Sequence, residues 1–171
     1  MSRHPLDDAF QHNTWATIRI IDACAELTPE QLDATVEGTR GSIIETLRHV
    51  VGSDSWYLSF FGDERIARID DGRPNDLPDL RAATITNGAL WLEVLADAPD
   101  ADQEIEEVGD DWRFVSPAGI RLAQAVHHGT DHRSQVCTIL TTLGIEPPEI
   151  DVWAYGHAVG REREEKLTPA T

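Results

Sequence analysis

The protein has 171 residues and a formal net charge of −17, because 31 Asp and Glu outnumber 14 Lys and Arg. A chain of this length predicts one domain, and its acidic excess disfavours binding to nucleic acid or to an anionic membrane through a basic surface. With 40% apolar residues, the composition is that of a folded protein rather than of a disordered acidic chain.

The first predicted helix begins near Pro5, a residue favoured at the first helical position. From Leu6 to Leu27, residues facing one side recur every three or four positions, which is the pattern of an amphipathic helix. Thr28 and Gln31 have the spacing of a capping box and predict a single short turn. Ser42 and Glu45 form a clearer capping box, which opens a second long helix running to about residue 61 and ending at Gly62.

A third helix is predicted from Leu77 to Ala96, although Gly88 lowers its helix propensity by about 1 kcal/mol. Residues 105–108 and 112–115 flank Gly-Asp-Asp and predict a short β-hairpin. Ser116 and Pro117 then supply an N-cap and a first-turn proline for the fourth long helix, which ends at Gly144. A last short segment is predicted at 150–159.

Four long helices, each with an apolar face to bury, predict an all-α four-helix bundle over residues 1–160 with a hairpin before the last long helix. Residues 161–171 are predicted to be a charged C-terminal tail. The sequence contains neither a leader pattern nor an apolar run long enough for a membrane span, so no membrane association and a cytoplasmic location are expected.

Two of the seven histidines, His128 and His132, lie about 40° apart on the wheel of the fourth helix, on its apolar stripe. Such an i, i+4 pair can bind one divalent metal ion, because both ring nitrogens can converge on it. Alternatively, Gln124 and Gln135 could satisfy two buried imidazoles without any metal. His127 lies on the opposite side of the helix and is expected to face solvent.

A third ligand from another helix would favour the metal site, and the candidates are His4, His12, His49 and His157. His4 and His157 lie near the chain ends and are poorer choices. His49 belongs to the second long helix, at the edge of its apolar arc, so periodicity alone leaves its role open.

Two strings carry a family resemblance, Leu-Arg-His-Val-Val-Gly-Ser-Asp-Ser-Trp at 47–56 and His-Gly-Thr-Asp-His-Arg-Ser-Gln at 128–135. With Asn-Thr-Trp at 13–15, Gly-Ser at 41–42 and the segment 147–155, they resemble the DinB/YfiT-like superfamily of bacterial four-helix bundles. The resemblance covers nearly the whole chain in the same motif order. The histidine string is fairly specific, whereas the other matches would mean little alone.

The resemblance implies a metal site formed by His49, His128 and His132, with zinc or nickel as the usual ion and an open position for water or substrate. It further implies a metal-dependent hydrolase, or a transferase or isomerase that uses a low-molecular-weight thiol such as mycothiol or bacillithiol. It identifies no catalytic side chain. A small-molecule substrate and a homodimer are the expected partners. The alternatives are a non-catalytic protein that binds a small molecule or metal, and a scaffold whose function is dimerisation.

Asp54 and Arg133 both lie on apolar arcs of helices that the resemblance places side by side, and we expect a buried or half-buried ion pair between them. The alternative is that Arg133 extends along the apolar surface to reach solvent. Asn13 is a candidate hydrogen-bonding residue near the site. Asp131 is more simply interpreted as a solvated carboxylate than as a contact of a metal-bound water.

The remaining notable side chains are predicted to be structural. Three tryptophans are expected in the core rather than in contact with substrate, namely Trp15, Trp56 and Trp153. Cys24 and Cys137 are far apart in sequence and lack metal-binding spacing, so both are predicted to be core thiols.

Overall fold

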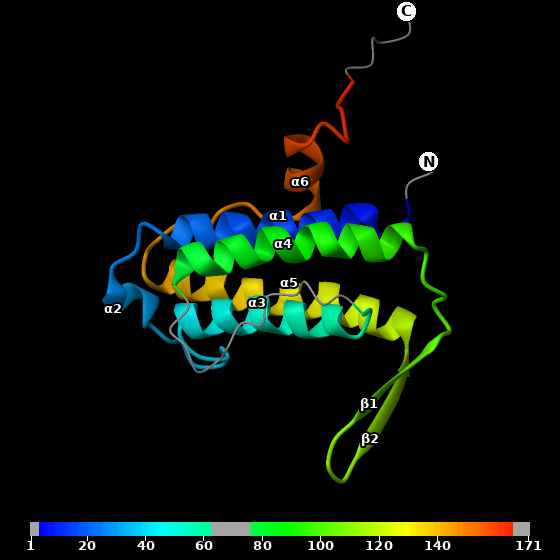
Figure 1. The fold of residues 1–171 in the computed structure, drawn as a ribbon. Coiled ribbons are helices and arrows are strands. Elements are labelled where there is room, and N and C mark those ends of the chain that lie inside the picture. The colour runs from blue at the N-terminus through cyan, green and yellow to red at the C-terminus, as the bar shows by residue number, and fades with distance from the viewer. Residues whose placement is uncertain (1–3, 63–75, 166–171) are drawn as a thin grey trace, which may run out of the picture.

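Four long helices form the body of the molecule in the computed structural model, which describes residues 4–62 and 76–165 (Figure 1). They are α1 (Asp7–Cys24), α3 (Ile43–Ser59), α4 (Leu77–Ala96) and α5 (Ala118–Thr142). Helix α1 packs against α4 and α5, and α3 packs against the same two helices. The predicted four-helix bundle with a hairpin before its last long helix is confirmed.

The predicted start and stop signals are mostly correct. Both capping boxes form: Ser42 opens α3, and Thr28 opens the single turn α2 (Pro29–Leu32). Gly62 and Gly144 have φ values of +85° and +75°, the left-handed region that glycine adopts without strain after a helix. Helix α1 instead begins two residues after Pro5, and its N-cap residue, Leu6, has no side-chain oxygen to cap it.

The hairpin before α5 is longer than predicted. Strands β1 (Glu104–Val108) and β2 (Arg113–Pro117) pair antiparallel, and Ser116 lies opposite Ile105. The prediction that Ser116 caps the next helix is wrong, because strand pairing continues through it and α5 begins only after Pro117. The Ser116 hydroxyl instead accepts a hydrogen bond of 2.9 Å from Nε of Arg121.

The last helix, α6 (Val152–Ala158), is capped by Asp151 and packs outside the bundle against α1 (Figure 1). Beyond it, Arg161 forms an ion pair of 2.6 Å with Asp8. Residues 166–171 of the predicted tail lie outside the described residues. Within residues 4–62 and 76–165, no helix is both long enough and apolar enough to span a membrane.

Two apolar clusters fill the bundle at different levels along its axis. One contains Ile20, Leu47, Leu80 and Ile139, and includes the buried thiol of Cys24. Cys137 is partly buried against the same cluster, so both cysteines pack as predicted.

The second cluster contains Phe10, Leu58, Trp91 and Leu122. In each long helix, buried polar residues lie in sequence between the residues of the two clusters. This polar layer contains Asn13, Thr17, Ser55, Thr84, Asn87 and Arg133.

The tryptophan predictions are largely wrong. Trp56 is 46% exposed and Trp153 is 77% exposed, whereas Trp15 is partly buried against Tyr155. Trp56 lies two helical turns from His49 and shares the same side of α3, which does not face the core. Trp153 is exposed because α6 lies outside the bundle. The tryptophan of the core is Trp91, which is fully buried.

Gly88 has a packing role that explains its presence within α4. A Cβ atom at this position would lie 2.6 Å from both Cγ2 and Oγ1 of Thr14 on α1. The glycine therefore lets the two helices approach closely, and the gain in contact offsets its poor helix propensity.

Candidate metal centre

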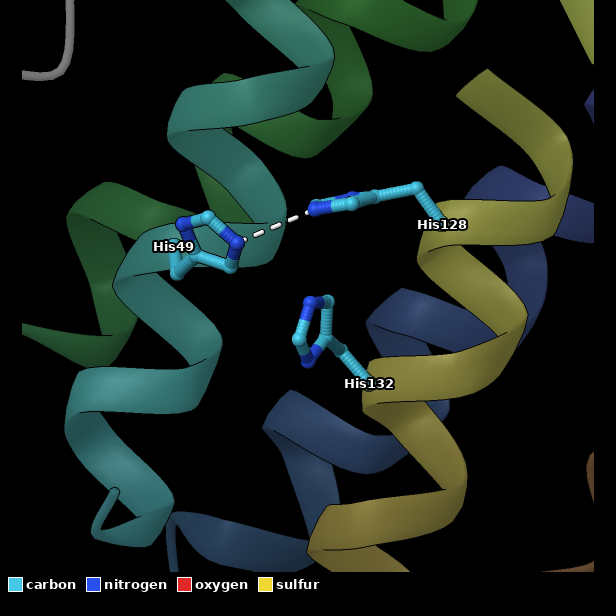
Figure 2. Close-up of side chains that lie close together, drawn as sticks. All are labelled: His49, His128 and His132. Atoms are coloured by element: carbon cyan, nitrogen blue, oxygen red, sulfur yellow. Dashed lines mark hydrogen bonds between the residues drawn. The ribbon is translucent and has the colours of Figure 1, made fainter. Parts of the chain in front are cut away.

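Three histidine side chains from two helices converge on one point (Figure 2). His49 projects from α3, and His128 and His132 project from α5, one turn apart on the same side of the helix. One ring nitrogen from each residue lies within 4.8 Å of those of the other two, and all three side chains are partly buried. The structure therefore brings together the three residues singled out in the sequence.

The spacing of these nitrogens fits the requirements of a divalent ion. Nε2 of His49 and Nε2 of His128 are 3.0 Å apart. Two nitrogens that are each 2.0–2.1 Å from one zinc ion lie roughly 3 Å from each other, so the pair already has the separation of two ligands. The ring of His132 is centred 4.5 Å from that of His128 and 4.7 Å from that of His49, which completes a three-nitrogen face.

Hydrogen bonds to the outer ring nitrogens orient two of the three imidazoles. Nδ1 of His132 lies 3.0 Å from Oε1 of Gln135, and this oxygen also accepts a 3.1 Å hydrogen bond from the backbone N–H of Arg40. An oxygen can only accept, so Nδ1 of His132 carries the proton and Nε2 keeps its lone pair for a metal.

Nδ1 of His49 lies 3.4 Å from the hydroxyl of Ser53. A hydroxyl can donate or accept, so it suits either tautomer of His49. Without a metal ion, the Nε2–H of His49 can donate a hydrogen bond to Nε2 of His128, while its Nδ1 accepts one from Ser53. When both Nε2 atoms bind an ion, His49 can donate from Nδ1 to Ser53 instead.

Of the two glutamines that could satisfy the α5 imidazoles in place of a metal, only one contacts a histidine. Gln135 does contact an imidazole, but through its outer nitrogen, which is compatible with metal binding. Gln124 does not contact a histidine and instead donates a 3.2 Å hydrogen bond to the hydroxyl of Tyr57.

The other histidines are not part of the cluster. Nε2 of His12 lies 2.7 Å from the backbone oxygen of Ile150, and this buried contact fastens the segment before α6 to the bundle. His4 contacts the first turn of α1, and His157 is exposed on α6. His127 is exposed on α5, as predicted.

The electrostatic surroundings keep His128 neutral. Burial, followed by the neighbouring charges of His132, His49 and Arg40, lowers the pKa of His128 to about 4, against the opposing effect of Asp131. A neutral imidazole has the lone pair that a metal ion requires. Asp131 itself is exposed, which agrees with its interpretation as a solvated carboxylate.

Asp54 and Arg133 do not form the expected direct ion pair. Arg133 is only 1% exposed, and its guanidinium donates to Oδ1 of Asn13 at 2.5 Å and to the hydroxyl of Thr17 at 3.1 Å. Asp54 accepts a 2.9 Å hydrogen bond from the indole N–H of Trp91. Both charges are thus held by polar neighbours, and they interact only through space. The alternative that Arg133 reaches solvent is also wrong.

A glycine on α5 makes the contact between Arg133 and Asn13 possible. A Cβ atom at Gly129 would overlap Oδ1 of Asn13 and lie 2.7 Å from Nη1 of Arg133. This close approach confirms the expectation that Asn13 hydrogen-bonds near the site.

Replacing Asp54 by asparagine is expected to stabilise the protein at neutral pH. Burial raises the pKa of Asp54 from 3.8 to about 6, despite hydrogen bonds from Trp91 and Asn87 and the charge of Arg133, which lower it. The folded state therefore binds the proton more tightly than the unfolded state, and stability is lost as pH rises from about 4 to about 6. Asparagine avoids this loss and can still accept from Trp91.

The expected gain in the free energy of unfolding is about 3 kcal/mol at pH 7 and below about 1 kcal/mol at pH 4. Urea denaturation of the Asp54→Asn and wild-type proteins at both pH values measures it. A variant that is less stable than wild type at pH 7 would show that the carboxylate is favourable where it lies.

Sequence reasoning missed several neighbours of the cluster. Ser53 is four residues after His49, a spacing that places both on one side of a helix and could have identified it. Tyr57 lies four residues after Ser53, so the same four-residue spacing continues to it, and its ring centre lies 5.6 Å from that of His128. Arg40 lies in the loop before α3, where no periodicity indicates its position.

Comparisons with known proteins agree with this architecture. The family model described as the DinB family matches residues 1–166. The crystal structure of a DinB-like protein from Bacillus cereus ATCC 10987 is similar to this structure, with a TM-score of 0.65 and 19% sequence identity. The match covers 82% of this chain and 92% of that chain, and at this identity it concerns the fold alone. No curated protein matches the sequence.

Proposed function

The chain belongs to the DinB family, and from this membership and the geometry of its histidines we propose that it is a metal-dependent enzyme. His49, His128 and His132 hold one divalent ion, zinc or nickel. The reaction is hydrolysis of a small molecule, or transfer or isomerisation with a low-molecular-weight thiol such as mycothiol or bacillithiol as co-substrate.

The observation that carries the proposal is the convergence of three ring nitrogens within 4.8 Å of one another. Gln135 supports it, because it fixes the tautomer of His132 that leaves Nε2 available. Three neutral ligands would leave an ion its full positive charge and an open position, where it would act as a Lewis acid on a carbonyl or lower the pKa of a water or thiol. The protein supplies the orientation of the imidazoles and the half-buried surroundings.

Metal analysis tests the proposal first. The protein is purified without a histidine tag, and we expect about one equivalent of zinc or nickel, or uptake of one equivalent when the ion is added. Less than about a tenth of an equivalent, with no uptake of either ion, would contradict a metal enzyme.

The alternative function is a non-catalytic protein that binds a small molecule or metal through the same site. Turnover separates the two. The metal-loaded protein is assayed with a panel of esters, amides and electrophiles, with and without added thiol, and the metal-free protein serves as the control. Metal-dependent turnover supports the enzyme, whereas stoichiometric binding without turnover of any compound in the panel favours the binding protein.

Light scattering tests the proposed homodimer.

A further inference from the structure

A small cavity with polar and apolar side chains in its wall lies beside the histidine cluster, in the interior of the bundle. The volume that the centre of a water molecule can occupy in this cavity is about 10 Å³, which is enough for one ordered water. The lining includes His128 from α5, Asp54 from α3, and Asn13 and Thr84 from the polar layer. A buried water needs two to four polar partners, and this lining offers them.

His128 differs from the other two histidines in how its outer nitrogen is satisfied. Gln135 holds Nδ1 of His132, and Ser53 holds Nδ1 of His49. Nε2 of His128 faces His49, so its Nδ1 carries the proton when Nε2 acts as an acceptor or ligand. Among the described residues, no hydrogen bond joins this Nδ1 to a protein atom, and His128 lines the cavity.

Asp54 is the charged acceptor on the cavity wall. One of its oxygens, Oδ1, accepts from the indole N–H of Trp91, and a carboxylate has further acceptor positions on both oxygens. Burial raises the pKa of Asp54 to about 6, so the group is still mainly ionised at pH 7. Imidazoles that bind metals commonly donate their other N–H to a carboxylate, a carbonyl or a water, which fixes the tautomer.

We propose that one ordered water in this cavity accepts a hydrogen bond from Nδ1–H of His128 and donates one to the carboxylate of Asp54. Asp54 is thereby the positioning residue for His128, as Gln135 is for His132. The inference rests on the proposed function only in treating His128 as a metal ligand. The tautomer of His128 and the water itself are properties of the metal-free protein as well.

Zinc affinity of two charge-matched variants tests the positioning role. Asp54→Asn removes the acceptor in the cavity, and Asp131→Asn removes an exposed carboxylate that also acts electrostatically on His128. Competition with a chelator at pH 7.5 is expected to show about tenfold weaker zinc binding for Asp54→Asn. Asp131→Asn is expected to change the affinity by less than about threefold. Equal losses in the two variants would overturn the proposal, because charge alone would then explain them.

A second measurement does not depend on metal binding. Long-range ¹H–¹⁵N spectra of the metal-free wild-type protein are expected to show His128 protonated at Nδ1, with a proton that exchanges with solvent more slowly than in Asp54→Asn. Protonation at Nε2, or the same exchange rate in both proteins, contradicts the proposal. A protein that binds no zinc but shows the protected Nδ1 proton would refute the proposed function and leave this inference standing.

Discussion

Replacing His132 by alanine is expected to weaken zinc binding by more than about 100-fold. Loss of a group that only orients a ligand costs 10–100-fold in metal affinity, and removal of a ligand itself costs more. The two remaining imidazoles cannot make up the loss, because two nitrogens leave half of a tetrahedral coordination sphere to water. Chelator competition, or calorimetry with the metal-free protein, measures the affinity.

His127→Ala is the matched control, since His127 lies on the same helix but is exposed on its other side. This variant removes one imidazole from α5 without touching the cluster, and its zinc affinity is expected to equal that of the wild type. Equal zinc affinity of the His132→Ala and wild-type proteins would mean that the ion binds elsewhere. Unfolding curves of both variants check that the fold is retained.

Replacing Arg133 by alanine is expected to destabilise the protein by about 3–5 kcal/mol. The guanidinium is 1% exposed and donates to Asn13, Thr17 and Thr130. Its removal leaves these acceptors without their donor and Asp54 without a nearby positive charge, and it opens a cavity in the bundle. Urea denaturation of the variant at pH 7 measures the loss in the free energy of unfolding.

The variant Arg133→Lys separates the effect of the positive charge at this position from the effect of the shape of the guanidinium. An ammonium keeps the charge near Asp54 but is a compact group without the planar fork that reaches several acceptors at once. Arg133→Lys is therefore expected to recover only part of the stability lost in Arg133→Ala. A loss below about 1 kcal/mol in the alanine variant would mean that the polar layer contributes little to the fold.

The four long helices could be predicted because local signals encode them. The capping box at Ser42 and the glycine stops act over three or four residues, so they are visible without the tertiary structure, as is the capping box at Thr28 that opens the short α2. Similarly, the side shared by His128 and His132 follows from the helical repeat. The position of His49 relative to this pair depends on how two helices pack, and only the family resemblance pointed to it.

Tertiary contacts account for what sequence reasoning missed. Trp56 and Trp91 cannot be told apart as exposed and buried until the faces of α3 and α4 are known. Two of the partners of Arg133, Asn13 and Thr17, come from α1, more than a hundred residues earlier in the chain, and the expectation of an ion pair considered only the charges. The cavity between His128 and Asp54 is a space between helices, and no sequence pattern encodes it.

The polar layer restricts how the helices can slide past one another. A shift of α5 by one turn moves each of its side chains by about 5.4 Å and would place the guanidinium of Arg133 within an apolar cluster, away from its acceptors. The same shift would carry the two α5 imidazoles out of reach of His49, since the ring nitrogens lie within 4.8 Å only in the present alignment. The layer thus holds the three histidines in position, so that the proposed binding of a metal ion would need little rearrangement of the helices.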